Sequence, residues 1–233
     1  MKIAIMQPYL LPYIGYFQLI NLVDKLVIYD NLKYTKKGWI NRNRILMNGK
    51  EKLFSIPIKK DSNYKNIDER FFSENSYVEK EKIISQIENS YRNAPFFKIM
   101  FPKIKTHFMY NERNIFKFIL NSLNQMITFL NIETESIFSS SLKINHELKR
   151  ENKVIAICRE LDVNNYINPI GGVDLYDKGV FNKNGINLSF IKSRIIHYKQ
   201  FDNEFIPWLS IIDVMMFNST KSIQLMLKEY EII

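Results

Sequence analysis

The sequence has very few of the residues from which disulfides and metal centres are built. It contains one cysteine and three histidines in 233 residues. A single cysteine excludes an intramolecular disulfide, and Cys158 lies on an apolar stripe of a predicted helix over 147–161, which favours a core position. The histidines, His107, His146 and His197, are too far apart for metal-ligand spacing, and His107 lies among apolar residues, as a packed or surface-helix histidine does. We therefore predict no metal site.

Long hydrophobic runs and nucleic-acid-binding motifs are also absent. No stretch approaches 18 uninterrupted apolar residues, and the chain begins with a strand pattern instead of a signal segment, so we expect a cytoplasmic protein without a membrane span. The net charge of +9 is scattered along the chain. It is consistent with an anionic ligand or with a composition biased towards lysine. Because the basic residues are scattered and no DNA-binding motif is recognisable, we expect no DNA partner.

The first 30 residues show the pattern of a strand, a turn, a helix and a second strand. The apolar strand over 2–6 stops at Gln7-Pro8, helical spacing follows from about 12 to 21, and a second apolar strand covers 25–29. Two strands joined by a crossover helix are parallel neighbours. The sequence predicts an α/β fold with a Rossmann-like parallel sheet, in which ligands bind beyond the carboxyl ends of the strands. Gln7 and Tyr9 follow the first strand and Asp30 follows the second.

The amino end of the first helix is directed at the same crevice. Its partial positive charge favours a phosphate or carboxylate, which makes Tyr13 and Gly15 candidate ligand-binding residues. The alternative is that Gly15 only allows the helix to approach the sheet closely.

Cations and amides surround a tryptophan in the segment Lys36 to Arg44. Arginine forks bind phosphate or carboxylate, and a tryptophan face holds a ring or a cation. In an extended chain the two arginines would share one face. The alternative is a lysine-rich surface turn with the tryptophan as a core anchor. The candidate binding residues here are Lys37, Trp39, Asn41, Arg42 and Arg44.

The rest of the chain is expected to complete one α/β domain over 1–233. A third strand over 52–58 would add cations to the rim of the sheet, and helices would fill a segment over 76–130. Strands are predicted over 135–138, 165–168 and 187–191. Between the last two, Gly171 and Gly172 precede a predicted helix, where backbone N–H groups and Tyr176 could meet a ligand, or where the chain simply turns.

Asp213 is open to two interpretations. Ser210 is a plausible helix cap with Asp213 three residues later, as in a capping box. The functional alternative is that Asp213, like Asp30, acts as a general base or binds an amine.

Four sequence blocks together, MQPYLLPYIGYF, WINRNRI, YINPIGGVDLY and LSIIDVMMFN, resemble the WbqC-like family over essentially the whole chain. The resemblance implies a role in bacterial surface-polysaccharide biosynthesis, notably of the O-antigen of lipopolysaccharide. It also implies glycyl or other aminoacyl transfer to an amino sugar, because some members are named as such transferases.

The element order also resembles the nucleotidylyltransferase-like α/β superfamily, whose His-x-Gly-His element binds ATP phosphates. This chain has Tyr13-Ile14-Gly15-Tyr16 at the matching place. Tyrosine is neutral near pH 7 and stabilises developing negative charge poorly, so adenylyl transfer is doubtful. Lys37, Arg42 and Arg44 are the cations that remain for a phosphate.

These observations favour a transferase that joins an amino acid to the amine of a nucleotide-activated amino sugar. The partner would be the nucleotide sugar, and the donor stays open between a free amino acid with ATP and an aminoacyl donor such as aminoacyl-tRNA. The alternative is a non-catalytic nucleotide-sugar or nucleotide-binding protein of polysaccharide assembly.

Overall fold

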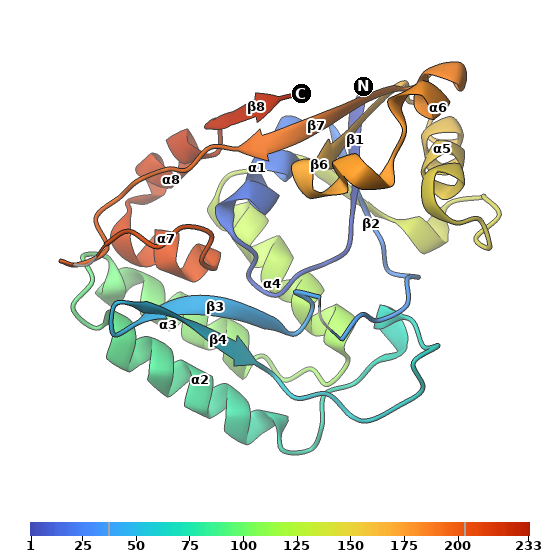
Figure 1. Ribbon diagram of the computed structural model, residues 1–233. Helices are drawn as coiled ribbons and strands as arrows, with labels where there is room; N and C mark the ends of the chain where they lie inside the picture. The colour runs from blue at the N-terminus through green and yellow to red at the C-terminus, as the bar shows by residue number, and fades with distance from the viewer. Residues whose placement is uncertain (37, 203) are drawn as a thin grey trace.

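A mostly parallel sheet forms the upper part of the protein in the computed structural model shown in Figure 1, which describes residues 1–36, 38–202 and 204–233. Its strand order is β5-β2-β1-β6-β7-β8, and the last strand alone runs antiparallel to its neighbour among the described residues. The chain builds outward from β1 on one side and then on the other, as in Rossmann-like sheets. The predicted α/β class is confirmed. The strands are β1 (Lys2–Met6), β2 (Lys25–Ile28), β5 (Glu135–Phe138), β6 (Asn165–Pro169), β7 (Asn187–Ser193) and β8 (Tyr230–Ile232).

Helices cover both faces of the sheet because the central strands are apolar on both sides. In β1, Ile3 and Ile5 pack into one hydrophobic cluster, and Ala4 packs into the other. The first cluster includes side chains of α5 (Arg150–Glu160) and α6 (Lys178–Lys183). The second includes side chains of α1 (Ile14–Leu22), α4 (Ile115–Phe129), α7 (Ile211–Phe217) and α8 (Thr220–Met226).

A β-hairpin and three helices are inserted between β2 and β5. The hairpin is β3 (Arg42–Met47) and β4 (Lys50–Ser55), and the expected helices are present as α2 (Ser76–Tyr91), α3 (Phe97–Met109) and α4. The hairpin, α2 and α3 lie below the sheet in Figure 1, and α4 runs from behind the sheet towards them. The strand expected over 52–58 was wrong in extent and place, because β4 ends at Ser55 and pairs with β3. Asn48 and Gly49 have φ of 52° and 71°, the left-handed values that a tight two-residue hairpin turn requires.

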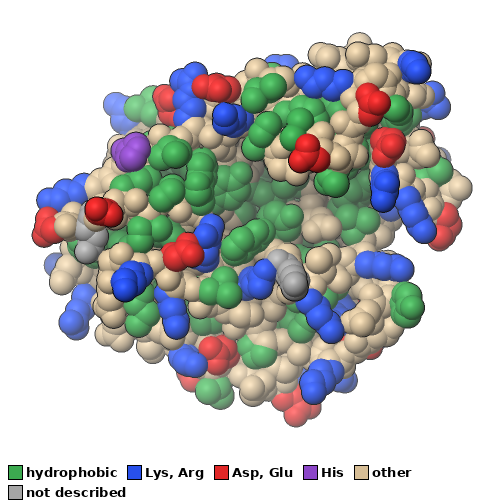
Figure 2. Space-filling view, in the orientation of Figure 1, with side chains coloured by type: hydrophobic (Ala, Val, Ile, Leu, Met, Phe, Trp, Pro, Cys, Tyr) green, Lys and Arg blue, Asp and Glu red, His purple; other side chains and the backbone are tan. Residues whose placement is uncertain are grey.

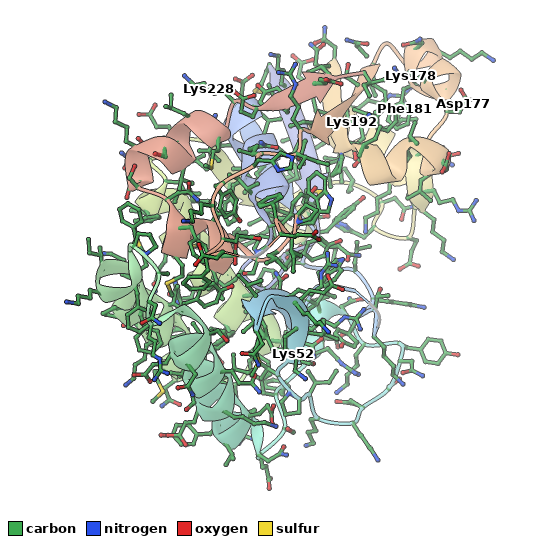
Figure 3. The ribbon with its side chains drawn as sticks, turned by 60° about the vertical axis from the view of Figure 1, so that its left-hand side comes forward. Lys52, Asp177, Lys178, Phe181, Lys192 and Lys228 are labelled. Carbon is green, nitrogen blue, oxygen red and sulfur yellow. The ribbon has the colours of Figure 1, made fainter. Side chains whose placement is uncertain are left out.

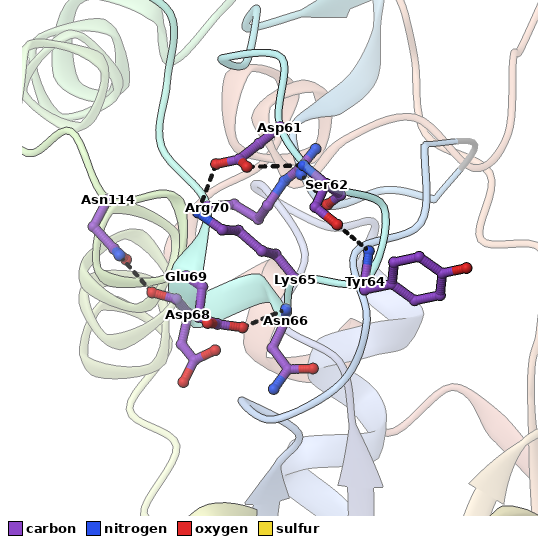
Figure 4. Close-up of polar contacts among 9 residues, drawn as sticks. All are labelled: Asp61, Ser62, Tyr64, Lys65, Asn66, Asp68, Glu69, Arg70 and Asn114. Carbon is purple, nitrogen blue, oxygen red and sulfur yellow. Dashed lines mark hydrogen bonds and ion pairs between the residues drawn. The ribbon is translucent and has the colours of Figure 1, made fainter.

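The loop between β4 and α2 is fixed by its own polar contacts (Figure 4). A capping box joins Asn66 and Glu69 around a short 3-10 helix, η1 (Ile67–Glu69), and Asn114 donates from Nδ2 to the Asp68 carbonyl at 2.6 Å. Arg70 is buried over the Tyr34 ring, 4.9 Å from its centroid. This loop therefore supports the turn that leads into β3.

Candidate functional site

A cavity of about 370 Å³ lies where the sheet meets the hairpin. Figure 2 shows a hollow between the upper and lower halves of the molecule, where hydrophobic side chains gather and cationic side chains lie along the lower side. The cavity walls come from the segments that follow β1 and β6, from the end of β7 and the loop after it, and from β3 and the segment before it. Its lining residues are Tyr9, Pro12, Tyr13, Trp39, Asn43, Arg44, Ile170, Lys192, Ser193 and Trp208. It therefore lies beyond the carboxyl ends of parallel strands, on both sides of the place where the strand order reverses.

Asn43 holds the segment after β1 against the hairpin. Its buried Nδ2 donates to the carbonyls of Leu10 and Leu11 at 2.8 and 2.7 Å. Leu11 has a φ of 42°, and its carbonyl also accepts from the Ser210 hydroxyl at 2.6 Å. These bonds satisfy a left-handed, buried turn and so fix the direction in which Tyr9 and Tyr13 leave the backbone.

Trp39 lies under both predicted arginines. In β3 the side chains of Arg42 and Arg44 share the less buried face, as expected for an extended chain. Their guanidinium carbons lie 5.5 and 5.2 Å from the Trp39 ring centroid, within cation–π range. Arg44 also lines the cavity, and Arg42 donates from Nε to the Gly38 carbonyl at 2.9 Å.

Arg44 is oriented from two sides. One terminal nitrogen, Nη1, lies 2.6 Å from Glu51, and the other, Nη2, donates to the Trp208 carbonyl at 3.3 Å. Lys192 is the second cation of the cavity and makes no ion pair with any residue that the structure describes. It lies on β7 in the upper half of the molecule, whereas Lys52 lies on the hairpin in the lower half (Figure 3). The described lining residues include no carboxylate, so the cavity is cationic as well as aromatic.

Gly15 makes room for two of the lining side chains. A Cβ on Gly15 would overlap the Ser193 hydroxyl and the Tyr13 ring. The ring of Tyr13 also meets Trp208 edge to face, with centroids 5.8 Å apart. Gly15 therefore allows the first helix to approach the sheet closely, which was the alternative left open by the sequence. This close approach brings Tyr13 and Ser193 together in the cavity wall.

Tyr16 faces the protein interior. Burial raises the pKa of its hydroxyl, which stays protonated and donates to the Gln7 carbonyl at 2.8 Å. Burial also raises the pKa of Tyr13. Both tyrosines are thus neutral near pH 7, at the places where the nucleotidylyltransferase-like pattern has histidines.

Comparisons with known proteins agree with the sequence blocks. The model of the WbqC-like protein family matches residues 7–225. This chain belongs to the WbqC-like family. It is 26% identical over 218 residues to the uncharacterized protein Rv1507c of Mycobacterium tuberculosis, with 92% of each chain covered. No solved structure matches significantly.

The described residues provide neither a membrane span nor a cluster of metal ligands. No helix there is long and apolar enough to cross a membrane. Those residues also contain no group of three or more histidine, cysteine or acidic side chains placed to hold a metal ion.

Several other residues named from the sequence lie outside the lining of the cavity. Asn41 is buried, accepts from the Tyr34 hydroxyl at 2.8 Å and donates to the Ile56 carbonyl at 2.8 Å. Lys37 lies outside the described residues. The backbone carbonyl of Gln7 accepts the hydrogen bond from the Tyr16 hydroxyl.

The paired glycines enter a 3-10 helix, η3 (Ile170–Leu175), and not the α-helix that was expected after them. A Cβ on Gly172 would overlap the Asn168 amide, so this glycine permits a tight turn, whereas nothing lies within 4 Å of a Cβ on Gly171. Tyr176 packs against Tyr166 and Phe181 in the cluster on the other face of the sheet. In this segment it is Ile170 that lines the cavity.

Asp213 is the centre of a buried network and is fully shielded from solvent. Its carboxylate accepts from Tyr198 and Gln200 at 2.6 and 2.7 Å, and from Tyr91 at 2.8 Å. Burial raises its pKa, and the three hydrogen bonds oppose that shift. Ser210 accepts from the Ile212 amide as a helix cap.

The Asp213 network reaches the cavity through one loop. Gln200 also donates to the Ile206 carbonyl at 3.1 Å and accepts from the Ile206 amide at 2.7 Å. Trp208 follows two residues later with a φ of 62° and forms part of the cavity wall. Gln200 thus connects Asp213 to the loop that carries Trp208.

Asp30 lies beyond β2 in a separate polar corner. Its carboxylate accepts from the Ser140 amide at 2.9 Å and from the Ser140 hydroxyl. Nearby, Lys153 is buried, donates to Asn31 at 3.4 Å and has its pKa lowered by that burial, with Asp30 opposing the shift. His146 completes the corner, 3.0 Å from the Asn31 side-chain nitrogen.

The sequence did not predict three of the lining residues, which are Lys192, Ser193 and Trp208. The rule that selected Gln7 and Asp30, polar residues at the carboxyl end of a strand, applies equally to Lys192 and Ser193 on β7. Trp208 is the second of two tryptophans in the chain. Its contact with Tyr13 joins segments almost 200 residues apart, which no local pattern reveals.

Proposed function

We propose that the cavity binds a nucleotide-activated amino sugar and that the protein transfers an amino acid, plausibly glycine, to the sugar amine. The observation that carries this proposal is the combination of aromatic walls with two cations at the carboxyl edge of the sheet. The aromatic side chains offer faces for a base or sugar ring, and they are Tyr9, Tyr13, Trp39 and Trp208. The charge for a diphosphate comes from Arg44 and Lys192. A cavity of about 370 Å³ is within the range of small-molecule sites.

The transfer forms an amide. The sugar amine attacks the acyl carbon of the activated amino acid, the bond to the donor's leaving oxygen breaks, and the amine nitrogen loses a proton. The candidate acceptor of that proton is Asp30, which follows β2 but lies in a polar corner outside the described lining, so the sugar amine would have to extend to it from the cavity. General-base assistance of this kind contributes about 10² to 10⁴ in rate. Asp213 is the second candidate base, and its hydrogen bonds favour a positioning role.

The remaining residues named from the sequence enter the proposal as supports of the pocket. Gln7, Gly15, Asn41 and Arg42 would support the cavity from behind its lining. Gly171 and Gly172 would shape the turn that carries Ile170, whereas Tyr176 packs in the cluster on the other face of the sheet. Lys37 would add charge at the same rim. The acyl donor is either a free amino acid activated by ATP or an aminoacyl-tRNA, for which the net charge of +9 is favourable.

A second candidate function is supported by one feature. The described residues that line the cavity include no carboxylate and no histidine. A protein that only binds the nucleotide sugar during O-antigen or other surface-polysaccharide assembly needs no such group.

One experiment separates the two functions. Purified protein is incubated with UDP- and dTDP-activated amino sugars and glycine, with ATP in one arm and charged glycyl-tRNA in another, and the sugar is followed by mass spectrometry. A gain of one glycyl unit supports transfer and identifies the donor. Nucleotide-sugar binding with no mass gain in either arm supports the binding function. Failure to bind any of the sugars contradicts both.

The two carboxylates are tested in the same assay. Asp30→Asn should bind the sugar normally and lose turnover by at least about 10²-fold, as expected when a general base is removed. Asp213→Asn keeps hydrogen-bonding capacity and should retain most turnover. The reverse result would make Asp213 the base.

A further inference from the structure

The excess positive charge of this chain is concentrated in the segment between β2 and η1. Residues 31–65 contain ten lysines and arginines and two acidic residues, a net charge of +8, whereas the whole chain carries +9. Basic residues occur along the whole chain, but the 23 that lie outside this segment are balanced by 22 acidic residues. The segment includes Trp39, Arg44 and the whole β3–β4 hairpin, so the excess charge lies on the chain that borders the cavity.

Most of these cations are not used inside the protein. Both acidic residues of the segment pair within it, Glu51 with Arg44 at 2.6 Å and Asp61 with Lys65 at 2.8 Å. Other lysines of the segment are exposed and make no ion pair with any residue that the structure describes, and they are Lys33, Lys36, Lys50, Lys52, Lys59 and Lys60. Their charge is available to an anionic partner.

Large apolar side chains are exposed around the same cavity. Leu53 is 48% exposed and is the cross-strand partner of Arg44, so the two side chains share one face of the hairpin. Trp208, which lines the cavity, is also exposed, and Ile195 adjoins it in a small neighbouring hollow. The hairpin and the loop after β7 therefore each bring exposed apolar side chains to the border of the cavity.

The short helix η3 adds a further apolar border. Its first residue, Ile170, lines the cavity, and Val173 and Leu175 are exposed, Leu175 by 66%. A 3-10 helix rises about 2 Å per residue, so Leu175 lies within about 10 Å of Ile170 along the helix axis. Figure 2 shows hydrophobic and cationic side chains together at the surface around the hollow. Exposed apolar residues that are grouped in this way mark an interaction surface.

An anionic membrane surface matches both the charge and the apolar side chains. Clusters of lysine and arginine are attracted to anionic lipid headgroups, and tryptophan and leucine gain by entering the boundary between headgroups and acyl chains. RNA would also be attracted by the charge and could stack on aromatic rings, but it would leave Leu53 and Leu175 in water. The apolar side chains therefore favour a membrane over a nucleic acid.

We infer that the face around the cavity docks on the surface of an anionic bilayer. The lysines of segment 31–65 contact the headgroups, and Leu53, Leu175 and Trp208 enter the interface. The mouth of the cavity then opens at the membrane surface. This inference goes beyond the proposed transfer and does not rest on it, because it uses exposed side chains and not the identity of the ligand.

Sedimentation with lipid vesicles tests the docking face. The purified protein is mixed with vesicles of phosphatidylglycerol and phosphatidylcholine in equal amounts, and with vesicles of phosphatidylcholine alone. We expect binding to the anionic vesicles to be at least about tenfold stronger, and to weaken as salt is raised, because the attraction of exposed charges is screened.

Two double variants separate the apolar contribution from the charge. Leu53→Ser/Leu175→Ser removes two side chains that enter the interface, and Lys33→Glu/Lys36→Glu reverses two charges at the headgroups. Each should weaken binding to the anionic vesicles at least about tenfold. The four side chains are exposed, so a melting curve should show each variant folded like the wild type.

Matched controls lie on α3, outside the segment and the cavity. Ile99→Ser removes an apolar side chain that is 59% exposed, and Lys98→Glu/Lys105→Glu makes the same change in net charge at exposed sites. Both should bind the anionic vesicles within about threefold of the wild type, which keeps the comparison at constant net charge.

Several results would overturn the inference. They are no binding of the wild type to anionic vesicles, equal binding to both kinds of vesicle, or losses in the α3 controls as large as those in the double variants, which would indicate nonspecific attraction. Release of the protein from the vesicles by an oligouridylate of equal charge concentration would identify RNA as the partner instead.

Discussion

The two cations that line the cavity and the two candidate carboxylates of this protein occupy different kinds of environment. Arg44 and Lys192 line the cavity between the sheet and the hairpin, where a ligand can reach them. Asp213 and Asp30 are buried, and their oxygens accept hydrogen bonds from the protein itself. The comparison teaches that Arg44 and Lys192 are available to a ligand, whereas Asp213 is used inside the protein behind the cavity wall and Asp30 in a separate polar corner.

The largest expected effect tests the structural half of this comparison. Asp213→Ala leaves the buried donors of Tyr91, Tyr198 and Gln200 without their shared acceptor, and each such loss costs about 1 to 3 kcal/mol. We expect the free energy of unfolding to fall by about 3 kcal/mol or more in urea denaturation. Asp202→Ala, at an exposed site, is the control and should change it by less than about 0.5 kcal/mol. A loss below about 1 kcal/mol for Asp213→Ala would show that these hydrogen bonds contribute little to stability.

The second prediction tests the ligand-facing half. Arg44→Ala removes a charged donor from the cavity, and a hydrogen bond to a charged group contributes about 1.5 to 3 kcal/mol. Affinity for a UDP-amino sugar, measured by calorimetry, should fall by about 30-fold, with a change in stability of about 1 kcal/mol or less. Arg194→Ala serves as the control, since Arg194 lies just after β7 and pairs with Glu229 and Glu231 outside this cavity. Intact binding with a large loss of stability would show that Arg44 holds the fold.

A smaller change tests how closely the wall is packed. Gly15→Ala should push Tyr13 and Ser193 away from their positions, and overpacking of this kind costs about 1 to 3 kcal/mol. We expect sugar affinity to fall several-fold, with a modest drop in melting temperature. The same substitution at Gly171, where a Cβ meets nothing within 4 Å, should be nearly neutral. Equal effects at the two glycines would mean that Gly15 has no special role in the wall.

The smallest effect concerns pH. Because burial raises the pKa of Asp213 above its ordinary value of 3.8, the folded state binds a proton more tightly than the unfolded state does. Its contribution to stability is therefore complete below about pH 4 and is lost as pH rises through the raised pKa. Asp213→Asn cannot titrate, so the wild type should lose stability relative to this variant as pH increases from 4. A difference that stays constant with pH would show that the carboxyl is not perturbed.

Much of the fold could be predicted because its signals are local. The β1–α1–β2 unit, the helices over 76–130 and the strands at 135–138, 165–168 and 187–191 all follow from apolar spacing and were found close to their observed places. The β3–β4 hairpin was not found, although Asn48-Gly49 is a strong turn signal, because the following strand was assigned to the main sheet. The short strand β8 has too few residues to carry a pattern.

The candidate site was predictable only in part. Tyr9, Tyr13, Trp39 and Arg44 follow from strand ends and from the cation-rich segment, and they do line the cavity. Trp208 and Lys192 could not be placed beside them without the tertiary fold. The partners of Asp213, which are Tyr91, Tyr198 and Gln200, lie outside its own helix. Sequence alone therefore could not decide between a cap, a base and a buried acceptor.

The most direct test of the account is calorimetric titration of a UDP-amino sugar into the wild-type protein and into the double variant Arg44→Ala/Lys192→Ala. The account predicts saturable binding to the wild type that weakens as salt is raised, and a loss of at least about 100-fold in the double variant with a cooperative melting transition retained. Equal affinity in the two proteins, or no binding to the wild type, would contradict the claim that this cationic, aromatic cavity holds the nucleotide sugar.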